Sequence, residues 1–406
     1  MARIKPFAAL RPRADVAARV SAPPYDVVTA DEAARLAGGN PLSFLHVSRA
    51  EIDLPAGVDA YAPAVYARAR ETFHRLRAEG VLRQDEQPCF YLYRLVMGAH
   101  SQVGLVATVS CEDYLQQAIR KHELTRPDKE TDRARHIAAL DAQTGPAFLV
   151  YPALAEVDKL VARWTQSPPQ VDFTAEDGVR HSTWTIAEAV DIRFLENAFA
   201  SIPRLYIADG HHRSAAAVRV FRERDGAGHS AWFLAVLFPH TQVRILPYNR
   251  LVKDLNGLTR EAFLARLSSV GSLDPVSARP VVPDAPGTVG IYLAGRWFKL
   301  RFAPQLAVAP TPAERLDVAL LQRHVLDAIL GIRDPRTSHR LEFVGGIRGL
   351  AALERPVDAG QHACAFALSP TRIEDLLAVA DAGGVMPPKS TWFEPKLRDG
   401  LFSHLI

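Results

Sequence analysis

The sequence predicts a mixed α+β fold, and three observations lead to this expectation. The chain has 406 residues, of which 48% are hydrophobic, enough to bury the cores of two or three domains. Short apolar runs typical of strands and segments with helical spacing follow one another without strict alternation. One such run, Leu205–Ala208, leads through Asp209 and Gly210 into an Ala-rich helical segment that extends to about Arg224. We therefore expect a multi-layer α+β body built around this strand–turn–helix unit.

The residues before this unit predict a succession of helices and strands. Thr29 is the N-cap candidate of a short helix. Pro127 suits the first position of a helix, and we expect helix on both sides of the segment Thr125–Pro127. The other expected elements are helices over residues 30–36, 61–79 and 153–164, and strands over residues 44–47, 89–96, 103–110 and 147–151.

Elements of both kinds continue after the unit, and they suggest a second domain. A hairpin is expected around Ala294 and Gly295. The expected elements are strands over residues 232–238, 243–246, 290–293 and 297–302, and helices over residues 260–268, 315–330 and 371–380. We place one α+β domain at residues 1–257 and a second at residues 258–406, with the tail Met386–Lys396 returning to the body.

Composition excludes several classes of protein. Lys and Arg number 48 and Asp and Glu 45, and the resulting net charge of +3 does not predict a nucleic-acid or membrane partner. The three cysteines are isolated and share no metal spacing, as expected for a protein of the reducing cytoplasm. The first residues lack the apolar stretch of a signal peptide, and no segment has the ~20 apolar residues of a membrane span. The sequence does not predict an oligomeric state.

The turn after Leu205–Ala208 predicts a phosphate site. A strand that enters a helix through Asp209 and Gly210 presents free backbone N–H groups and the positive helix end at one point. His211, His212 and Arg213 add donors in the first turn. Cations are disfavoured at this end of a helix unless an anion binds there. In the alternative interpretation, Asp209 is an ordinary N-cap and the first turn is solvated.

A charged segment, Lys121–His136, is the second candidate. Lys121, Lys129 and Arg133 are suited to contact phosphates. Glu123 and Glu130 are suited to act as a base or a metal ligand. The alternative is a helix face with ion pairs three and four residues apart.

Two further segments contribute candidates. The tail Met386–Lys396 contains Lys389 followed by Ser and Thr, but it lacks the Gly-rich approach of a P-loop and also fits a rigid strap. Glu51 lies in a polar N-terminal segment. The chain lacks the G-x-S-x-G, zinc-binding and G-x-G-x-x-G patterns of serine hydrolases, zinc enzymes and nicotinamide enzymes.

Seven ordered blocks give the chain a family resemblance. They are PPYDV (Pro23–Val27), NPLSFLHVSRAEIDLP (Asn40–Pro55), KHELTRPDKETDRARH (Lys121–His136), AQTGP (Ala142–Pro146), ADGHHR (Ala208–Arg213), YNRLVKDLNG (Tyr248–Gly257) and MPPKSTWFEPK (Met386–Lys396). In this order they resemble a prokaryotic family catalogued as domain of unknown function 1015. The resemblance spans essentially the whole chain, but the family name implies no activity.

The DGHHR turn is also similar to the signature of the ParB/sulfiredoxin superfamily, and especially to that of free-serine kinases. This resemblance implies a ParB/sulfiredoxin-like core and a site in which Asp209, His211, His212 and Arg213 hold phosphate and Mg²⁺. Glu123 or Glu51 would be the base. The turn contains no cysteine, which argues against the sulfinic-acid repair of sulfiredoxins, and the basic helix-turn-helix expected of a DNA-partitioning ParB is missing.

Together these features predict a phosphotransferase that uses ATP or ADP with Mg²⁺ on the hydroxyl of a small metabolite such as free serine. The predicted catalytic residues are Asp209, His211, His212, Glu123 and Glu51, with Asp209 also the Mg²⁺ ligand. The predicted phosphate- and nucleotide-binding residues are Gly210, Arg213, Lys121, Arg126, Lys129, Arg133 and Lys389. A non-catalytic nucleotide-binding regulator and a structural or interaction protein remain as alternatives.

Overall fold

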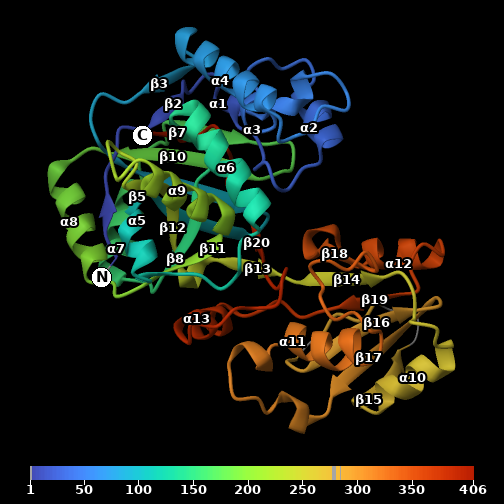
Figure 1. Ribbon diagram of the computed structural model, residues 1–406. Coiled ribbons are helices and arrows are strands. Elements are labelled where there is room, and N and C mark those ends of the chain that lie inside the picture. The colour runs from blue at the N-terminus through green and yellow to red at the C-terminus, as the bar shows by residue number, and fades with distance from the viewer. Residues whose placement is uncertain (1, 277–279, 284) are drawn as a thin grey trace. The chain divides into compact units, whose positions relative to one another are not determined.

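The computed structural model describes residues 2–276, 280–283 and 285–406, and its fold is mixed α/β, as the sequence predicts (Figure 1). The chain forms two compact units. The first comprises Met1–Arg120, Thr125–Val243 and Pro395–Ile406, and the second comprises Lys121–Leu124 and Arg244–Glu394. The chain enters the second unit at Arg244 rather than after residue 257, because β14 (Tyr248–Val252) pairs with two strands of the second unit.

A large mixed sheet forms the core of the first unit. Its strands follow the order β6 (Ile119–Arg120), β11 (Leu205–Asp209), β8 (Ala147–Tyr151), β12 (Trp232–Pro239), β5 (His100–Ser110), β4 (Phe90–Met97), β10 (Arg180–Ile186) and β9 (Val171–Thr174). β11 pairs in parallel with β6, and β12 in parallel with β8, while the other neighbours in this order are antiparallel. The strands predicted at residues 89–96 and 103–110 are confirmed as β4 and β5, which pair with each other.

Helices of the first unit pack on this sheet and on one another. Local sequence explains several starts: Thr29 and Glu32 form a capping box on α2, and Pro127 is the first residue of α6. The helices are α1 (Ala17–Val20), α2 (Ala30–Ala37), α3 (Leu45–Ser48), α4 (Pro63–Ala78), α5 (Cys111–Leu115), α6 (Pro127–Leu140), α7 (Ala155–Trp164), α8 (Ala189–Ala200) and α9 (His211–Glu223). α6 packs against α9, and the buried residues Ala216, Ala217 and Val220 of α9 join the core of the sheet.

Two expected elements are wrong. The strand predicted at residues 44–47 is the helix α3, because Phe44, Leu45 and Val47 pack into a helical cluster with Phe73 of α4. A short apolar run does not by itself separate a strand from a buried helix. The helix expected just before Thr125 is absent: α5 ends at Leu115, and the chain then forms β6 beside β11.

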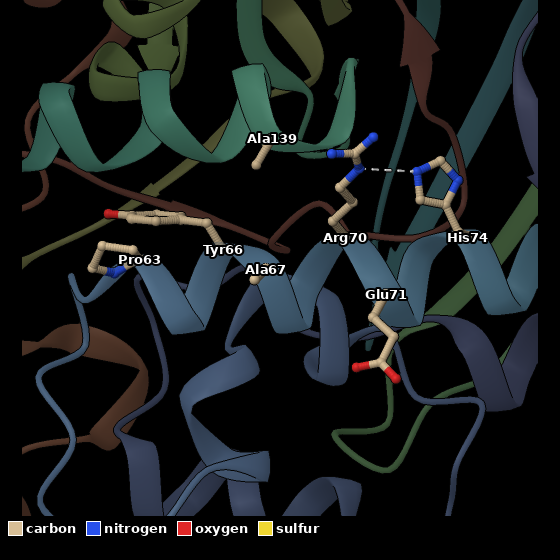
Figure 2. Close-up of a pocket in the computed structure, with 7 residues that line it drawn as sticks. All are labelled: Pro63, Tyr66, Ala67, Arg70, Glu71, His74 and Ala139. Atoms are coloured by element: carbon tan, nitrogen blue, oxygen red, sulfur yellow. Dashed lines mark hydrogen bonds between the residues drawn. The ribbon is translucent and has the colours of Figure 1, made fainter.

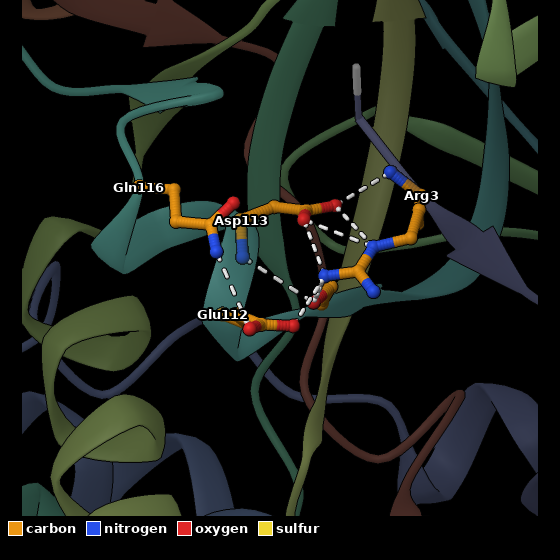
Figure 3. A network of polar contacts seen from close by, with 5 residues as sticks. Arg3, Glu112, Asp113 and Gln116 are labelled. Carbon is orange, nitrogen blue, oxygen red and sulfur yellow. Dashed lines mark hydrogen bonds and ion pairs between the residues drawn. The ribbon is translucent and has the colours of Figure 1, made fainter.

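The start of the chain is held by a polar network on α5 (Figure 3). β1 (Ile4–Lys5) pairs with β5, and just before it the backbone N–H of Arg3 donates to Asp113 Oδ2 at 2.7 Å. The Arg3 guanidinium contacts Asp113 Oδ1 at 2.6 Å and Glu112 Oε2 at 2.8 Å. The network therefore fixes the first strand against the edge of the α5 turn.

The second unit contains an antiparallel sheet flanked by helices. Its strand order is β15 (Gly271–Val276), β17 (Arg296–Phe302), β16 (Thr288–Leu293), β19 (Cys364–Ala367), β14 and β18 (Leu341–Gly345). β16 and β17 confirm the predicted hairpin. The other elements include α10 (Arg260–Ser268), α11 (Asp317–Leu321), which continues into a π-helical segment, α12 (Ala351–Asp358), α13 (Ile373–Asp381), and the pair β13 (Arg244–Leu246) and β20 (Trp392–Glu394). In the part of the chain that the structure describes, each helix is too short or too polar to cross a bilayer.

Candidate functional site

The predicted strand–turn–helix unit is confirmed as β11 and α9. Gly210 joins them with a φ of 87°, a backbone conformation that favours glycine. A Cβ at this position would lie 3.1 Å from Arg213 Nε and 3.2 Å from Ala147 Cα. Both the conformation and the space therefore require glycine, which brings the start of α9 close to β8.

Arg213 is the central cation of this turn, and it is 9% exposed. Its Nη1 donates to the carbonyl oxygen of Pro146 at 2.5 Å, and its Nη2 lies 3.7 Å from Asp209 Oδ1. Asp209 Oδ1 also accepts from the Gly210 N–H at 2.7 Å, and Lys396 Nζ donates to Asp209 Oδ2 at 2.8 Å. Among the described residues, Arg213 Nε has no hydrogen-bond partner.

The charges of this turn stabilise one another. Burial alone would raise the pKa of Asp209, but the charges of Lys396 and Arg213 hold that pKa well below its usual range. Burial would lower the pKa of Arg213, but Asp26, Asp209 and Asp399 raise it above its usual value. At neutral pH Asp209 is therefore a carboxylate and Arg213 a cation, and each stabilises the charge of the other.

Arg213 lines a small cavity of about 30 Å³. The cavity is lined by Tyr25, Ser48, Arg133, His136, Ile137, Gln143, Thr144, Gly145, Arg213 and Asp399. Eight of these residues come from five of the seven sequence blocks; Ile137 directly follows the block Lys121–His136, and Asp399 lies three positions after the last block. Segments that are far apart in the chain thus meet at one site inside the first unit.

The second cation of the cavity is Arg133, on α6. Its Cζ lies 4.0 Å from the centroid of the Tyr25 ring, and its Nη2 lies 2.7 Å from Asp132 Oδ2. Tyr66 of α4 donates to the other oxygen of Asp132 at 2.9 Å. Stacking and pairing thus hold the guanidinium in one orientation.

His136, one helical turn after Arg133, is uncharged at neutral pH. Burial, followed by the charge of Arg133, lowers the pKa of His136 to about 4. Its Nε2 lies 3.0 Å from the carbonyl oxygen of Val47, which can accept only if Nε2 carries the proton.

Asp399 is the carboxylate of the cavity, and sequence reasoning missed it. It is 3% exposed, and its Oδ1 has no hydrogen-bond partner among the described residues. Burial raises the pKa of Asp399 to about 7; Arg213 and Arg133 oppose this rise and Asp26 adds to it. The only signal in the sequence was an acidic residue shortly after Lys396, and such a residue is ordinary in a polar tail.

The other predicted residues of the first unit lie outside the lining of the cavity. His212 Nε2 accepts from the backbone N–H of Arg126 at 3.0 Å, and the Arg126 side chain pairs with Asp128 in an exposed position. Lys129 Nζ donates to Tyr61 Oη at 2.7 Å. His211 is buried in the first turn of α9.

Glu51 is close to the site in the chain but is already paired. It belongs to a 3₁₀ turn, Ala50–Asp53, and its Oε1 lies 2.7 Å from Arg49 Nε. Arg49 Nη1 in turn donates to the carbonyl oxygen of Tyr25 at 3.0 Å. Glu51 thus supports the Tyr25 segment through Arg49.

Three predicted residues, Lys121, Glu123 and Lys389, belong to the second unit. The Met386 N–H donates to the carbonyl oxygen of His122 at 2.9 Å and so ties the segment Lys121–Leu124 to the tail. Lys389 Nζ lies 5.7 Å from the centroid of the Tyr248 ring.

A larger groove of about 500 Å³ runs along α4 and is open to solvent (Figure 2). Arg70 projects from α4 toward α6 beside Ala139, the Tyr66 ring lies over Pro63, and Arg70 Nε donates to His74 Nε2 at 3.4 Å. The charged residues that line this groove, Arg70 and Glu71, are exposed. The groove lacks the convergent buried charges of the cavity, which makes the cavity the better candidate site.

Comparison with protein families identifies the group to which the chain belongs. The model of a family described as a protein of unknown function, DUF1015, matches residues 4–319. The chain is a member of the DUF1015 family. This confirms the family resemblance over a range that contains six of the seven blocks, while the block Met386–Lys396 lies outside the match. The ParB/sulfiredoxin likeness of the DGHHR turn stays a prediction.

Comparisons with curated proteins and solved structures do not identify an activity for this DUF1015 member. No curated protein matches the chain. SbnI with a C-terminal truncation from Staphylococcus aureus is 14% identical with a TM-score of 0.40, over 72% of this chain and 85% of that chain. A conserved hypothetical protein from Pyrococcus furiosus is 12% identical with a TM-score of 0.37, over 73% and 93% of the two chains. A free serine kinase in complex with AMP is 14% identical with a TM-score of 0.35, over 71% and 86%. Likenesses at this level do not define an activity.

Proposed function

We propose that this DUF1015 member is a nucleotide-dependent phosphotransferase that acts on the hydroxyl group of a small metabolite such as free serine. The observation that carries the proposal is the convergence of two oriented arginines, Arg213 and Arg133, with the buried carboxyl of Asp399 at one cavity. Phosphoryl transfer needs preorganised cations for the phosphates and an acceptor for the hydroxyl proton.

The phosphate end of the proposed site lies at the start of α9. α9 begins directly after Gly210, and among the described residues no side chain caps it; the N–H groups of its first turn lack intrahelical partners, and the helix end carries partial positive charge. Arg213 is fixed by Asp209 and by the Pro146 carbonyl, and Arg133 by Tyr25 and Asp132, so that little reordering is needed when phosphate binds.

The proposed cofactors are ATP or ADP with Mg²⁺. The Asp209 carboxylate fits poorly as a direct Mg²⁺ ligand, because Lys396 and the Gly210 N–H already occupy its two oxygens. We therefore assign Asp209 to the positioning of Arg213 and expect Mg²⁺ to arrive on the nucleotide, whose phosphates are preferred oxygen ligands.

The test is phosphoryl transfer by the purified protein. It is incubated with Mg²⁺, ATP or ADP, and a panel of hydroxy amino acids and other small alcohols, and products are identified by ³¹P NMR and mass spectrometry. We expect a phosphorylated acceptor, and a loss of at least 100-fold in kcat/KM for Arg213→Met and Arg133→Met.

The matched control is Arg219→Met. Arg219 lies on the same helix as Arg213, but its Nε pairs with Glu223 in an exposed position. Circular dichroism establishes that each variant is folded. If the parent protein consumes no nucleotide with any acceptor, or if both arginine variants retain full activity, the proposal is wrong.

A second function, nucleotide binding without transfer, would use the two oriented arginines, Arg213 and Arg133, and needs no room for an acceptor beside Asp399. A volume of about 30 Å³ is of the order of one water molecule, so the cavity has to open for either function. A regulator of this kind would be stabilised by nucleotide in a thermal-shift assay and would show no response to any acceptor, whereas an enzyme would respond to both.

A further inference from the structure

The carboxyl of Asp399 is held in place by its backbone. Asp399 and Ala22 exchange two backbone hydrogen bonds, of 2.9 and 3.1 Å. These bonds tie the C-terminal segment Pro395–Ile406 to the residues just before Tyr25. The next residue, Gly400, has a φ of 83°, and a Cβ there would lie 2.7 Å from Phe44. The chain therefore turns tightly after Asp399, and the position of its side chain is defined by the packing on both sides.

Space is kept open in front of this carboxyl. Gly145 lies opposite, and a Cβ at that position would come within 3.1 Å of Asp399 Oδ1 and 3.2 Å of Arg213 Cδ. Oδ1 is buried and has no hydrogen-bond partner among the described residues. A buried acceptor without a donor is costly, so its presence beside a cavity points to a ligand that donates a proton.

We propose that Asp399 is the catalytic base that accepts the proton of the substrate hydroxyl. This inference rests on the proposed phosphotransferase function and names the base of that same site. As the hydroxyl oxygen attacks the terminal phosphorus of the nucleotide, its proton passes to Asp399 Oδ1. The new O–P bond forms while the bond from that phosphorus to the bridging oxygen breaks, and the shortened nucleotide leaves with the bonding electron pair.

The surroundings of Asp399 suit this role. The charges of Arg213 of α9 and Arg133 of α6 lower its pKa, and the charge of Asp26, which follows Tyr25 in the chain, raises it. His136, the other titratable side chain of the α6 wall, is neutral, and Arg398 pairs with Asp177. Burial, partly offset by the arginines, raises the pKa of Asp399 to about 7, where a base is both available and effective at physiological pH.

The two bases expected from sequence are less suitable. The Glu51 carboxylate is paired with Arg49 and is absent from the lining of the cavity. Glu123 is likewise absent from that lining, whereas Asp399 lines the same cavity as Arg213.

The experiment compares Asp399→Asn with the parent protein and with Asp172→Asn, a control in which the aspartate of an exposed pair with Arg180 is changed. Nucleotide affinity is measured by calorimetry, and kcat is measured from pH 5.5 to 9. We expect Asp399→Asn to bind nucleotide within threefold of the parent and to lose at least 100-fold in kcat, with Asp172→Asn unchanged.

The pH profile provides a second, independent readout. For the parent, kcat should rise about tenfold per pH unit below pH 7 and level off above it, and this rise should be absent in Asp399→Asn. If Asp399→Asn keeps kcat within threefold, or if the parent profile is flat, the base assignment is overturned while the phosphotransferase function stands. If the parent transfers no phosphoryl group to any acceptor, the proposed function itself fails and the base assignment with it. If Asp399→Asn does not fold, the parent profile alone decides.

Discussion

Arg213 of the first unit and Arg250 of the second are both buried, and the two arginines are stabilised in opposite ways. Arg213 of the first unit is surrounded by the carboxylates of Asp26, Asp209 and Asp399, which raise its pKa against the effect of burial. Arg250 of the second unit donates to backbone carbonyl oxygens, and burial lowers its pKa to about 9. Burial of an arginine is thus no sign of function by itself. The carboxylates and the cavity beside Arg213 distinguish a candidate site from a structural cation.

Arg250 has a structural role, because it binds backbone carbonyl oxygens of two separate segments. It donates to the carbonyl oxygens of Tyr248 at 2.7 Å, Pro388 at 3.2 Å and Lys389 at 3.0 Å, and its Cζ lies 4.5 Å from the Phe343 ring centroid. It thereby holds the tail around Lys389 on β14. This supports the interpretation of the tail as a strap, and it leaves Lys389 without an assigned role in phosphate binding.

The largest effect is expected for Arg213→Met in the first unit. The change removes the cation shared by three carboxylates and leaves buried charge uncompensated, which typically costs about 3–5 kcal/mol. Urea denaturation at pH 7.5 measures the free energy of unfolding. A loss below ~1 kcal/mol would mean that the carboxylates do not depend on Arg213, and the contrast between the two arginines would disappear.

The next effect is expected for Asp399→Asn, which should raise the free energy of unfolding rather than lower it, by an amount that depends on pH. The pKa of Asp399 is about 7 in the folded protein against 3.8 for an ordinary aspartate, so the folded state holds this proton more tightly. The resulting stability is fully present below about pH 4 and is lost as the pH rises through 7. Asp399→Asn should therefore match the parent at pH 4 and exceed it above pH 8, by up to about 4 kcal/mol. Denaturation curves at the two pH values test this, and a variant that is less stable than the parent at pH 8.5 would contradict it.

A smaller loss is expected for Arg250→Met in the second unit. The carbonyl oxygens of Tyr248, Pro388 and Lys389 lose their donor, which costs about 1–3 kcal/mol, but the penalty for burying a cation is removed as well. Phosphotransfer should be unchanged, because the proposed site lies within the first unit. A loss larger than that of Arg213→Met would reverse the comparison.

The smallest effect is expected for Arg219→Met on α9. Arg219 forms an exposed ion pair with Glu223 and donates a hydrogen bond to Thr131 Oγ1 of α6 at 2.9 Å, and together these contribute no more than ~1 kcal/mol to the free energy of unfolding. This variant therefore calibrates the others, since it removes an arginine from the same helix as Arg213 without touching the cavity. A loss above ~1 kcal/mol would show that charge removal from α9 is damaging wherever it occurs.

Much of the first unit could be predicted where the signal is local. The capping box of Thr29 and the position of Pro127 at the start of α6 depend on neighbouring residues alone, and so does the turn at Gly210. The run Phe44–Val47 could not be assigned correctly, because its helical form depends on packing against Phe73, which lies far along the chain. The same reason explains β6, which exists only because β11 lies beside it.

The candidate site also has one part that follows from local sequence and one part that depends on packing between distant segments. Asp209, Gly210 and Arg213 belong to one local motif whose geometry follows from strand, turn and helix, so the sequence by itself determined this part together with the family of the chain. Only the tertiary structure decided that Arg133 joins Arg213 at the cavity, that Lys396 neutralises Asp209, and that Asp399 provides the carboxyl. Residues that are distant in the chain become neighbours through the packing of α6, α9 and the returning tail, and the charge state of Asp399 depends on the burial which that packing creates.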